Sequence, residues 1–185
     1  MAYTPPIDEK QLIEDLQNPL TAKDGFNTLM RRYGEQLYWQ IRKMVFNHDD
    51  ANDILQNCFI KVWNNLHNFR GDAKLSTWLY KIAVNESINF LNKERQRRSI
   101  TDDSEDSFLL ANIESDEYFD GDELQKEFME AIMKLPEKQR IVFNMKYFDD
   151  MKYEQMSEIC GTSVGALKAS YHHAVKKISA MLGMK

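Results

Sequence analysis

Side chains that could perform covalent or metal chemistry are scattered through this sequence. The two cysteines, Cys58 and Cys160, lack a CxxC pattern or a Cys/His cluster, so neither a disulfide framework nor a zinc site is predicted. His172 and His173 are adjacent, and adjacent residues on a helix point about 100° apart, which does not suit chelation of one ion. A Gly-rich phosphate loop, an HExxH motif and a serine nucleophile motif are also missing. We therefore predict no catalytic residue, no metal site, no cofactor and no enzymatic activity.

Charge is the stronger signal, and it is segregated along the chain. The net charge of the 185 residues is −5, which by itself argues against a nucleic-acid partner. Residues 101–123 hold ten acids and no Lys or Arg, whereas residues 1–100 hold 14 cations and 12 acids, and residues 124–185 hold 10 and 7. Two mildly basic parts thus flank an acidic connector. We predict that this connector is a flexible linker whose apolar residues, such as Phe108 and Tyr118, could dock on a partner.

The elements that must position the charged residues are predicted to be helices. In the first basic part, apolar residues recur every three or four positions over residues 26–45, and a second apolar stripe follows. The stripe consists of Ala51, Ile54, Leu55, Cys58, Phe59, Val62, Trp63 and Leu66. Its expected N-cap is Asp49 or Asp50. After a loop at 67–72, a third helix ends in a basic cluster at 93–98, which could be no more than a solvated helix end.

The second basic part predicts shorter helices. Residues 153–159 have the apolar spacing of a two-turn helix, Gly161 suits a left-handed turn, and Ser163 is a suitable N-cap for a last helix. Two short helices joined by such a turn are typical of a helix-turn-helix, whose second helix enters the major groove of DNA. No alternating strand pattern appears, so we predict an all-α fold.

Several of these stretches resemble a known family. The first part contains DANDILQNCFIKVW at 50–63, FRGD at 69–72 and STWLYKIAVN at 76–85. Their order and spacing resemble region 2 of bacterial sigma factors of the extracytoplasmic function (ECF) group in the sigma-70 family. The second part contains LPEKQRIVF at 135–143, YEQMSEI at 153–159 and SVGALK at 163–168, which resemble region 4 of the same group.

The resemblance implies two small helical domains joined by the acidic linker. The expected boundaries are an N-terminal extension at 1–20, region 2 at 21–98, the linker at 99–123 and region 4 at 124–185. The implied function is to bind core RNA polymerase, direct it to two-part promoters and help melt them. Two alternatives stay open: a helix-turn-helix regulator that is not a sigma factor, and a helical adaptor that binds only protein. The apolar runs are far shorter than the roughly 20 residues of a membrane span, so we expect a cytoplasmic protein without membrane insertion.

The resemblance places polymerase binding on the helix that carries Asp53, Gln56 and Asn57. In the family this helix packs on the clamp helices of the polymerase β′ subunit, and its short polar side chains suit a positively charged partner helix. Asn57 stands where the family commonly has Glu. Without the resemblance, a solvated helix face would be the simpler interpretation. The resemblance also implies contact of region 4 with the β flap, promoter DNA as a partner, and an anti-sigma factor as a further candidate partner.

The resemblance assigns minus-ten DNA to a loop and to the helix after it. The candidate residues are Asn68, Phe69, Arg70, Lys74, Lys81, Asn85 and Arg95. A captured base needs an aromatic wall, which Phe69 could supply, and an amide for its edge, which Asn85 could supply. Cations would neutralise the neighbouring phosphates. For Trp78, core packing is the preferred interpretation.

The last helix is assigned to minus-thirty-five DNA. The candidate residues are Ser163, Lys168, Ser170, His172, His173 and Lys176. The N–H groups at the start of this helix can bind a phosphate. Many relatives carry Arg at the positions of Ser170 and His173, and the lack of Arg weakens the expected readout of guanine.

Overall fold

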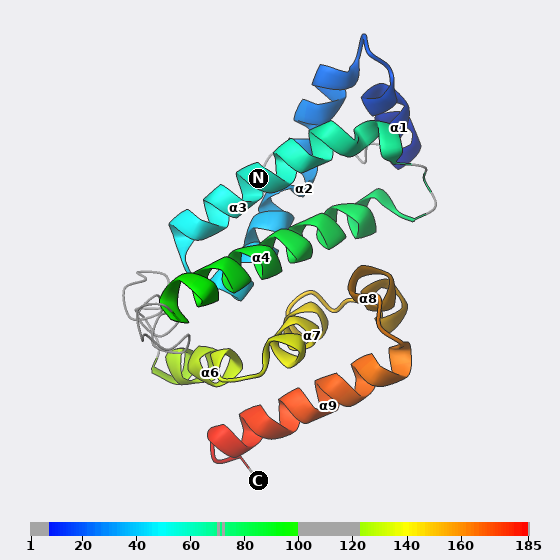
Figure 1. Cartoon of the computed structure of the whole chain (residues 1–185). Helices are drawn as coiled ribbons and strands as arrows, with labels where there is room; N and C mark the ends of the chain where they lie inside the picture. Colours follow the sequence, from blue (N-terminus) through cyan, green and yellow to red (C-terminus); the bar gives the residue numbers. More distant parts are fainter. Residues whose placement is uncertain (1–7, 70, 72, 100–122, 185) are drawn as a thin grey trace.

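The computed structural model describes residues 8–69, 71, 73–99 and 123–184. Within these ranges it contains eight α-helices, a short 3-10 turn and no strand, which confirms the predicted all-α fold. The helices are α1 (Glu9–Gln17), α2 (Ala22–Val45), α3 (His48–Asn65), α4 (Leu75–Ser99), α6 (Glu123–Met133), α7 (Glu137–Tyr147), α8 (Tyr153–Cys160) and α9 (Val164–Met181), with the 3-10 turn at Leu66–Asn68. They form two groups, α1–α4 and α6–α9, that stack on each other (Figure 1). The central residues of the predicted linker, 100–122, lie outside the described residues.

Helices α2, α3 and α4 pack around the core of the first group. The buried residues of α3 are Ala51, Ile54, Cys58 and Val62, all members of the predicted apolar stripe. Trp63, which belongs to the same stripe, is 45% exposed. None of the described helices is long and apolar enough to cross a membrane.

The junction between α2 and α3 differs from the prediction. The N-cap of α3 is Asn47, whose side-chain oxygen accepts hydrogen bonds from the backbone N–H groups of Asp49 (2.9 Å) and Asp50 (3.0 Å). The two aspartates therefore lie in the first turn, where their charge suits the positive end of the helix dipole. Phe46 ends α2 in a left-handed conformation (φ 58°) and is fully buried, so the chain turns sharply into α3.

The segment interpreted from the sequence as an N-terminal extension contains a helix, α1. Leu12 and Leu16, one turn apart, are buried against the rest of the first group. Gly25 permits this packing because a Cβ there would lie 3.1 Å from the backbone nitrogen of Leu16. Asp8 caps the helix by accepting a hydrogen bond from the backbone N–H of Lys10. Residues 8–17 thus contribute to the core of the first group.

The second group contains the predicted helix-turn-helix. Gly161 ends α8 in the left-handed region (φ 61°), which glycine adopts without strain. Ser163 is the N-cap of α9, and its hydroxyl accepts a hydrogen bond from the backbone N–H of Ala166 (3.3 Å). Both predicted turn residues are confirmed. Leu167, Ala174 and Ile178 form the buried side of α9.

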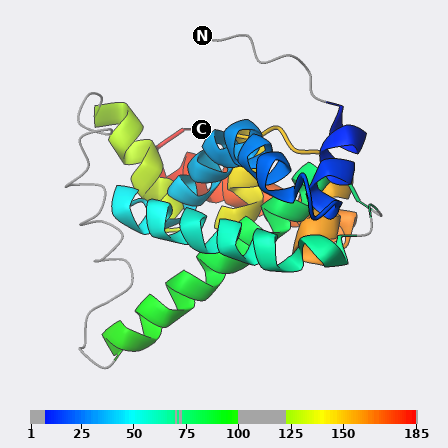
Figure 2. The ribbon, with the colours of Figure 1, turned by 90° about the horizontal axis from the view of Figure 1, so that it is seen from above.

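The two groups contact each other through α2 with α7 and through α4 with α8. Near the end of α2, the Lys43 ammonium lies 2.9 Å from the Asp149 carboxylate, and the Asn144 amide donates to the Lys43 carbonyl (2.9 Å). We call these three residues the interdomain contact. Figure 2 shows that the last turns of α4 project beyond the other helices. The orientation of the two groups was not predicted from the sequence.

Candidate functional site

The outer face of α3 presents the residues predicted to bind polymerase. Asp53, Gln56 and Asn57 are all exposed and lie away from the buried stripe of this helix. At the start of the same helix, Asn52 and His48 share a side-chain hydrogen bond of 3.0 Å. The structure therefore brings the three predicted residues together on one solvent-facing surface.

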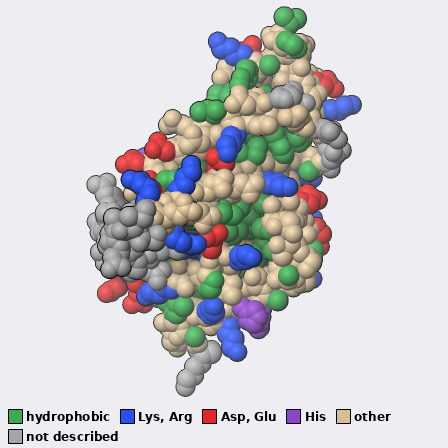
Figure 3. Space-filling model, in the orientation of Figure 1, with side chains coloured by type: hydrophobic (Ala, Val, Ile, Leu, Met, Phe, Trp, Pro, Cys, Tyr) green, Lys and Arg blue, Asp and Glu red, His purple; other side chains and the backbone are tan. Residues whose placement is uncertain are grey.

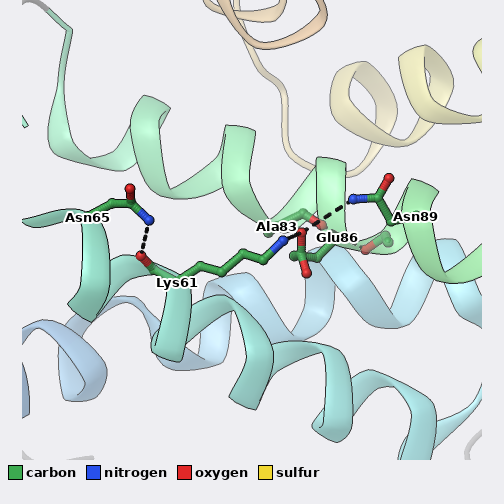
Figure 4. Close-up of polar contacts among 6 residues, drawn as sticks. Lys61, Asn65, Ala83, Glu86 and Asn89 are labelled. Atoms are coloured by element: carbon green, nitrogen blue, oxygen red, sulfur yellow. Dashed lines mark hydrogen bonds and ion pairs between the residues drawn. The ribbon is translucent and has the colours of Figure 1, made fainter. Parts of the chain in front are cut away.

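An ion pair joins α4 to α3, and hydrogen bonds within each helix lie beside it. The Lys61 ammonium pairs with the Glu86 carboxylate at 2.5 Å, and the Asn65 amide donates to the Lys61 carbonyl at 2.8 Å (Figure 4). Within α4, the buried Ser87 hydroxyl donates to the carbonyl of Ala83. Of these contacts, the Lys61–Glu86 ion pair joins α3 to α4, and the other two lie within one helix each.

The exposed face of α4 carries three of the residues predicted to bind minus-ten DNA. Lys81, Asn85 and Arg95 are exposed. At about 100° per residue, all three fall within about 80° of one another around the helix, so they form one line along α4. Arg95, near the projecting end of the helix, also pairs with Glu137 at the start of α7 (3.2 Å). The structure thus places an amide between two cations along one surface.

The loop before α4 is arranged differently from the prediction. Phe69 is only 7% exposed, and its ring packs on Trp78 with centroids 5.1 Å apart. In this conformation the ring supports the loop from inside and does not form an open wall for a base. Asn68 and Lys74 are exposed, whereas Arg70 lies outside the described residues.

Helix α1 fastens this loop at both ends, which the sequence analysis did not predict. The Gln17 amide donates to the carbonyl of Phe69 (3.0 Å). The Glu9 carboxylate accepts from the backbone N–H of Leu75, the first residue of α4 (3.0 Å). The available sequence signal was weak: an Asp8 cap followed by two leucines four positions apart.

The face of α9 predicted to contact minus-thirty-five DNA is open to solvent. Ser163, Lys168, His172, His173 and Lys176 are exposed, and Ser170 is half-buried. The Lys168 ammonium lies 5.6 Å from the centre of the Tyr153 ring on α8. The rings of His172 and His173 are 6.0 Å apart and inclined by 63°. These residues form a polar surface on the second helix of the helix-turn-helix, and Lys168 and Lys176 supply its positive charge.

The described residues contain no group of three His, Cys, Asp or Glu side chains that could hold a metal ion. Cys58 is buried in the core, and burial, with a smaller effect of Glu86, raises the pKa of its thiol to about 12. Burial also raises the pKa of the Cys160 thiol. Both thiols are therefore protonated at neutral pH and are weak nucleophiles.

The interdomain contact contains a buried carboxyl group, that of Asp149, beside the Lys43 ammonium. Burial raises the pKa of the Asp149 carboxyl, and the hydrogen bond from Lys43 only partly offsets this effect. The ion pair has good geometry, but burial still penalises the charged carboxylate. At this contact the attraction between Lys43 and Asp149 opposes the cost of burying the charged carboxylate.

Comparisons with known proteins identify the two parts of the chain. The family model described as Sigma-70 region 2 matches residues 29–97, and the one described as Sigma-70, region 4 matches residues 125–178. The chain is 30% identical over 182 residues to the RNA polymerase sigma-H factor of Pseudomonas aeruginosa, covering 94% of this chain and 93% of that protein. It is 30% identical over 158 residues to the ECF RNA polymerase sigma factor SigW of Bacillus subtilis, covering 81% and 84%.

Solved structures share the fold. The sigma factor RpoE from Bartonella quintana, in complex with the anti-sigma factor NepR, has a TM-score of 0.67 at 21% identity and covers 85% of this chain and 96% of its own. CnrH in complex with the cytosolic domain of CnrY has the same TM-score at 20% identity, covering 95% and 94%. With both family regions matched in order and relatives similar along nearly their whole length, this chain belongs to the sigma-70 family of RNA polymerase sigma factors and, within it, to the ECF group.

Proposed function

We propose that this protein binds core RNA polymerase, directs it to two-part promoters and helps melt them. The observation that carries the proposal is the presence of both sigma regions on one chain, each with most of its predicted surface residues exposed. A regulator that only shared the helix-turn-helix would leave the polar face of α3 without a purpose. Nucleotide addition belongs to the polymerase, so the chain contributes binding energy alone. This work requires the protein to be in the cytoplasm, where polymerase and promoters are.

Polymerase binding is assigned to the outer face of α3. Asp53 supplies a negative charge, and Gln56 and Asn57 supply amides that can both donate and accept hydrogen bonds. Short side chains lose little conformational entropy when a partner helix covers them. A basic helix, such as those of the β′ clamp, is the partner that fits this face.

Promoter melting is assigned to the line of residues along α4. The Asn85 carboxamide can pair with the edge of an unstacked base, while Lys81 and Arg95 neutralise phosphates on either side. Because Phe69 is buried against Trp78, we assign it the support of the loop that leads into α4. Asn68 and Lys74 are close enough in sequence to extend the same surface, and Arg70 keeps its predicted phosphate role.

Promoter docking is assigned to α9. Its first turn offers free backbone N–H groups, and Lys168 and Lys176 add positive charge along the exposed face. We assign contact with base edges in the major groove to His172 and His173, which are exposed, and to Ser170 on the half-buried flank of the helix.

Binding both promoter elements at once requires the two helical groups to separate. Elements named for positions −10 and −35 lie roughly 80 Å apart on duplex DNA, at about 3.4 Å per base pair. A compact chain of this length has a radius of gyration of about 16 Å. We call the arrangement in which α1–α4 and α6–α9 contact each other the closed form. The closed form therefore represents the protein before promoter binding, and the interdomain contact must break when the promoter binds. An anti-sigma factor that holds this closed form is a further candidate partner, supported by the anti-sigma complexes of the two structural neighbours.

Transcription in a defined system tests the proposed function. Pure protein, core polymerase and a promoter template should together yield specific transcripts, and omission of the protein should abolish them. A helix-turn-helix regulator would bind the DNA but would not form a complex with core polymerase. An adaptor would bind protein without giving specific initiation.

A further inference from the structure

A second ion pair joins the two groups in the closed form, where the end of α4 meets the start of α7. The Arg95 guanidinium donates to the Glu137 carboxylate, with Nη2 and Oε2 3.2 Å apart. The Glu137 side chain is 22% exposed and the Arg95 side chain is 45% exposed. The pair therefore lies at the edge of the interface, where a ligand can reach the guanidinium. Figure 3 shows acidic side chains among Lys and Arg side chains across the middle of the molecule, where the two groups stack.

Glu137 presents its carboxylate at the start of a helix. It is the first residue of α7 and follows Pro136, the N-cap. The positive end of the helix dipole favours a negative charge at this place. A guanidinium uses the same N–H donors for a carboxylate as for a phosphate. Glu137 therefore occupies a donor of the side chain that we assign to a phosphate of minus-ten DNA.

A neighbouring ion pair on α4 shows what is particular about this contact. The Arg97 guanidinium pairs at 2.9 Å with the carboxylate of Glu94, which lies three residues before it. Both residues belong to α4, so this pair does not depend on whether the two groups are in contact. Arg95 and Glu137 are 42 positions apart and belong to different groups, so their pair requires the closed form.

We propose that Glu137 inhibits binding of minus-ten DNA by occupying Arg95 in the closed form. The carboxylate takes the place of a phosphate, so closure and DNA compete for one guanidinium. This inference rests on the proposed assignment of Arg95 to promoter DNA and adds a control of that site within the chain itself. Because coupling between two binding events is reciprocal, DNA that captures Arg95 favours separation of the two groups, and separation raises the affinity for DNA.

Binding of labelled single-stranded DNA of random sequence to the full-length chain tests the competition. Glu137→Gln should tighten binding about 1.4- to 5-fold, which is the shift that corresponds to the loss of one exposed ion pair. Arg95→Ala should weaken binding. In the Arg95→Ala background, Glu137→Gln should give no gain, because the guanidinium that it releases is missing. Fluorescence anisotropy titrations of the four proteins complete this double-mutant cycle.

Energy transfer between dyes on the two regions reports closure in the same samples. Glu137→Gln should lower the transfer without DNA, and saturating DNA should lower it in the wild-type chain. Glu94→Gln is the matched control, since it removes the same charge from the same end of α4 but breaks a pair within that helix. It should leave the transfer unchanged. Far-UV circular dichroism should show unchanged helicity for all variants.

Three results would overturn the inference. The first is an equal gain in DNA affinity from Glu137→Gln with and without Arg95, which would make the effect one of net charge. The second is unchanged energy transfer at saturating DNA. The third, weaker DNA binding by Arg95→Ala without any gain from Glu137→Gln, would overturn the inhibition and leave the promoter role of Arg95 intact. Wild-type DNA binding by Arg95→Ala would instead overturn that promoter role and the inference with it, whereas transcription by the wild-type chain in the defined system tests the proposed function separately.

Discussion

Asn85 combines an exposed carboxamide with a position between two cations on α4. We expect Asn85→Ala to impair open-complex formation on duplex promoter while polymerase binding stays normal, because the lost contact forms only with melted DNA. Loss of one amide contact to a base edge costs about 1–3 kcal/mol, roughly a 5- to 150-fold change in the melted-state equilibrium. Permanganate footprinting of the melted region measures the effect. A pre-melted template should restore part of the activity, and Asn89→Ala, one turn further along α4, is the control.

Lys168 is a second single-residue test, because it can contact either phosphate or a base. Its exposed ammonium, near the Tyr153 ring, favours a phosphate contact. We expect Lys168→Ala to weaken binding of minus-thirty-five DNA with unchanged base preference. The slope of the logarithm of the binding constant against the logarithm of the salt concentration should become smaller by about one unit. Fluorescence anisotropy across a salt series measures both quantities. A changed base preference with an unaltered slope would make Lys168 a base reader.

At the scale of elements, α1 is bonded to the loop between α3 and α4, which the sequence did not predict. The hydrogen bonds run to Phe69 and to Leu75. Glu9→Ala removes the acceptor for the backbone N–H of Leu75, and Gln17→Ala removes the donor to Phe69. Each substitution should cost about 0.5–2 kcal/mol of stability, as for the loss of a helix cap. Hydrogen exchange should increase in residues 66–77, and promoter opening should decline. Gln11→Ala is the control because Gln11 bonds only within α1, to Asp15.

If both loop substitutions left exchange and opening unchanged, α1 would only fill space in the core. If exchange rose without a defect in opening, the loop conformation would not limit melting. Either result would remove α1 from the promoter machinery.

At the scale of the whole molecule, the interdomain contact sets how readily the two regions separate. Lys43→Glu places a second carboxylate beside Asp149 and should open the closed form, shifting the equilibrium by about 0.5–3 kcal/mol, the range for coupled neighbours. Energy transfer between dyes on the two regions should fall. The exchanged pair, Lys43→Glu with Asp149→Lys, should restore it. Equal opening by the single and exchanged variants would show that the charges do not control closure.

The same contact predicts a pH dependence. Burial raises the pKa of Asp149 in the closed form above its ordinary 3.8, so the closed form binds more protons there than the open form. Closure should therefore be most favoured below about pH 4 and weaken as the pH rises through the raised pKa. Asp149→Asn should flatten this dependence in energy-transfer titrations. An unchanged profile would assign the pH effect to other groups.

Much of the architecture was predictable because helix formation depends on neighbouring residues. The spacing of apolar residues predicted α2 and α3, and the Gly161 turn and Ser163 cap were correct. The family resemblance assigned roles to polar residues of α3 and α4; these residues are exposed, and their roles stay predictions. The correct helix predictions share one cause: hydrogen bonds four residues apart and a period of 3.6 determine both the helix and the face on which each side chain lies.

Only the tertiary structure decided which helix faces are covered by other elements. It also decided how the two regions contact each other. Lys43 and Asp149 are 106 residues apart, and nothing local to either residue indicates their pairing. Phe69 was expected to display its ring, but packing on Trp78 buries it. Trp63 lies on the predicted apolar stripe, but it is 45% exposed, with its ring packed edge-on against Phe26. Burial depends on which elements meet in space, whereas periodicity reports only the side of a helix on which a residue lies.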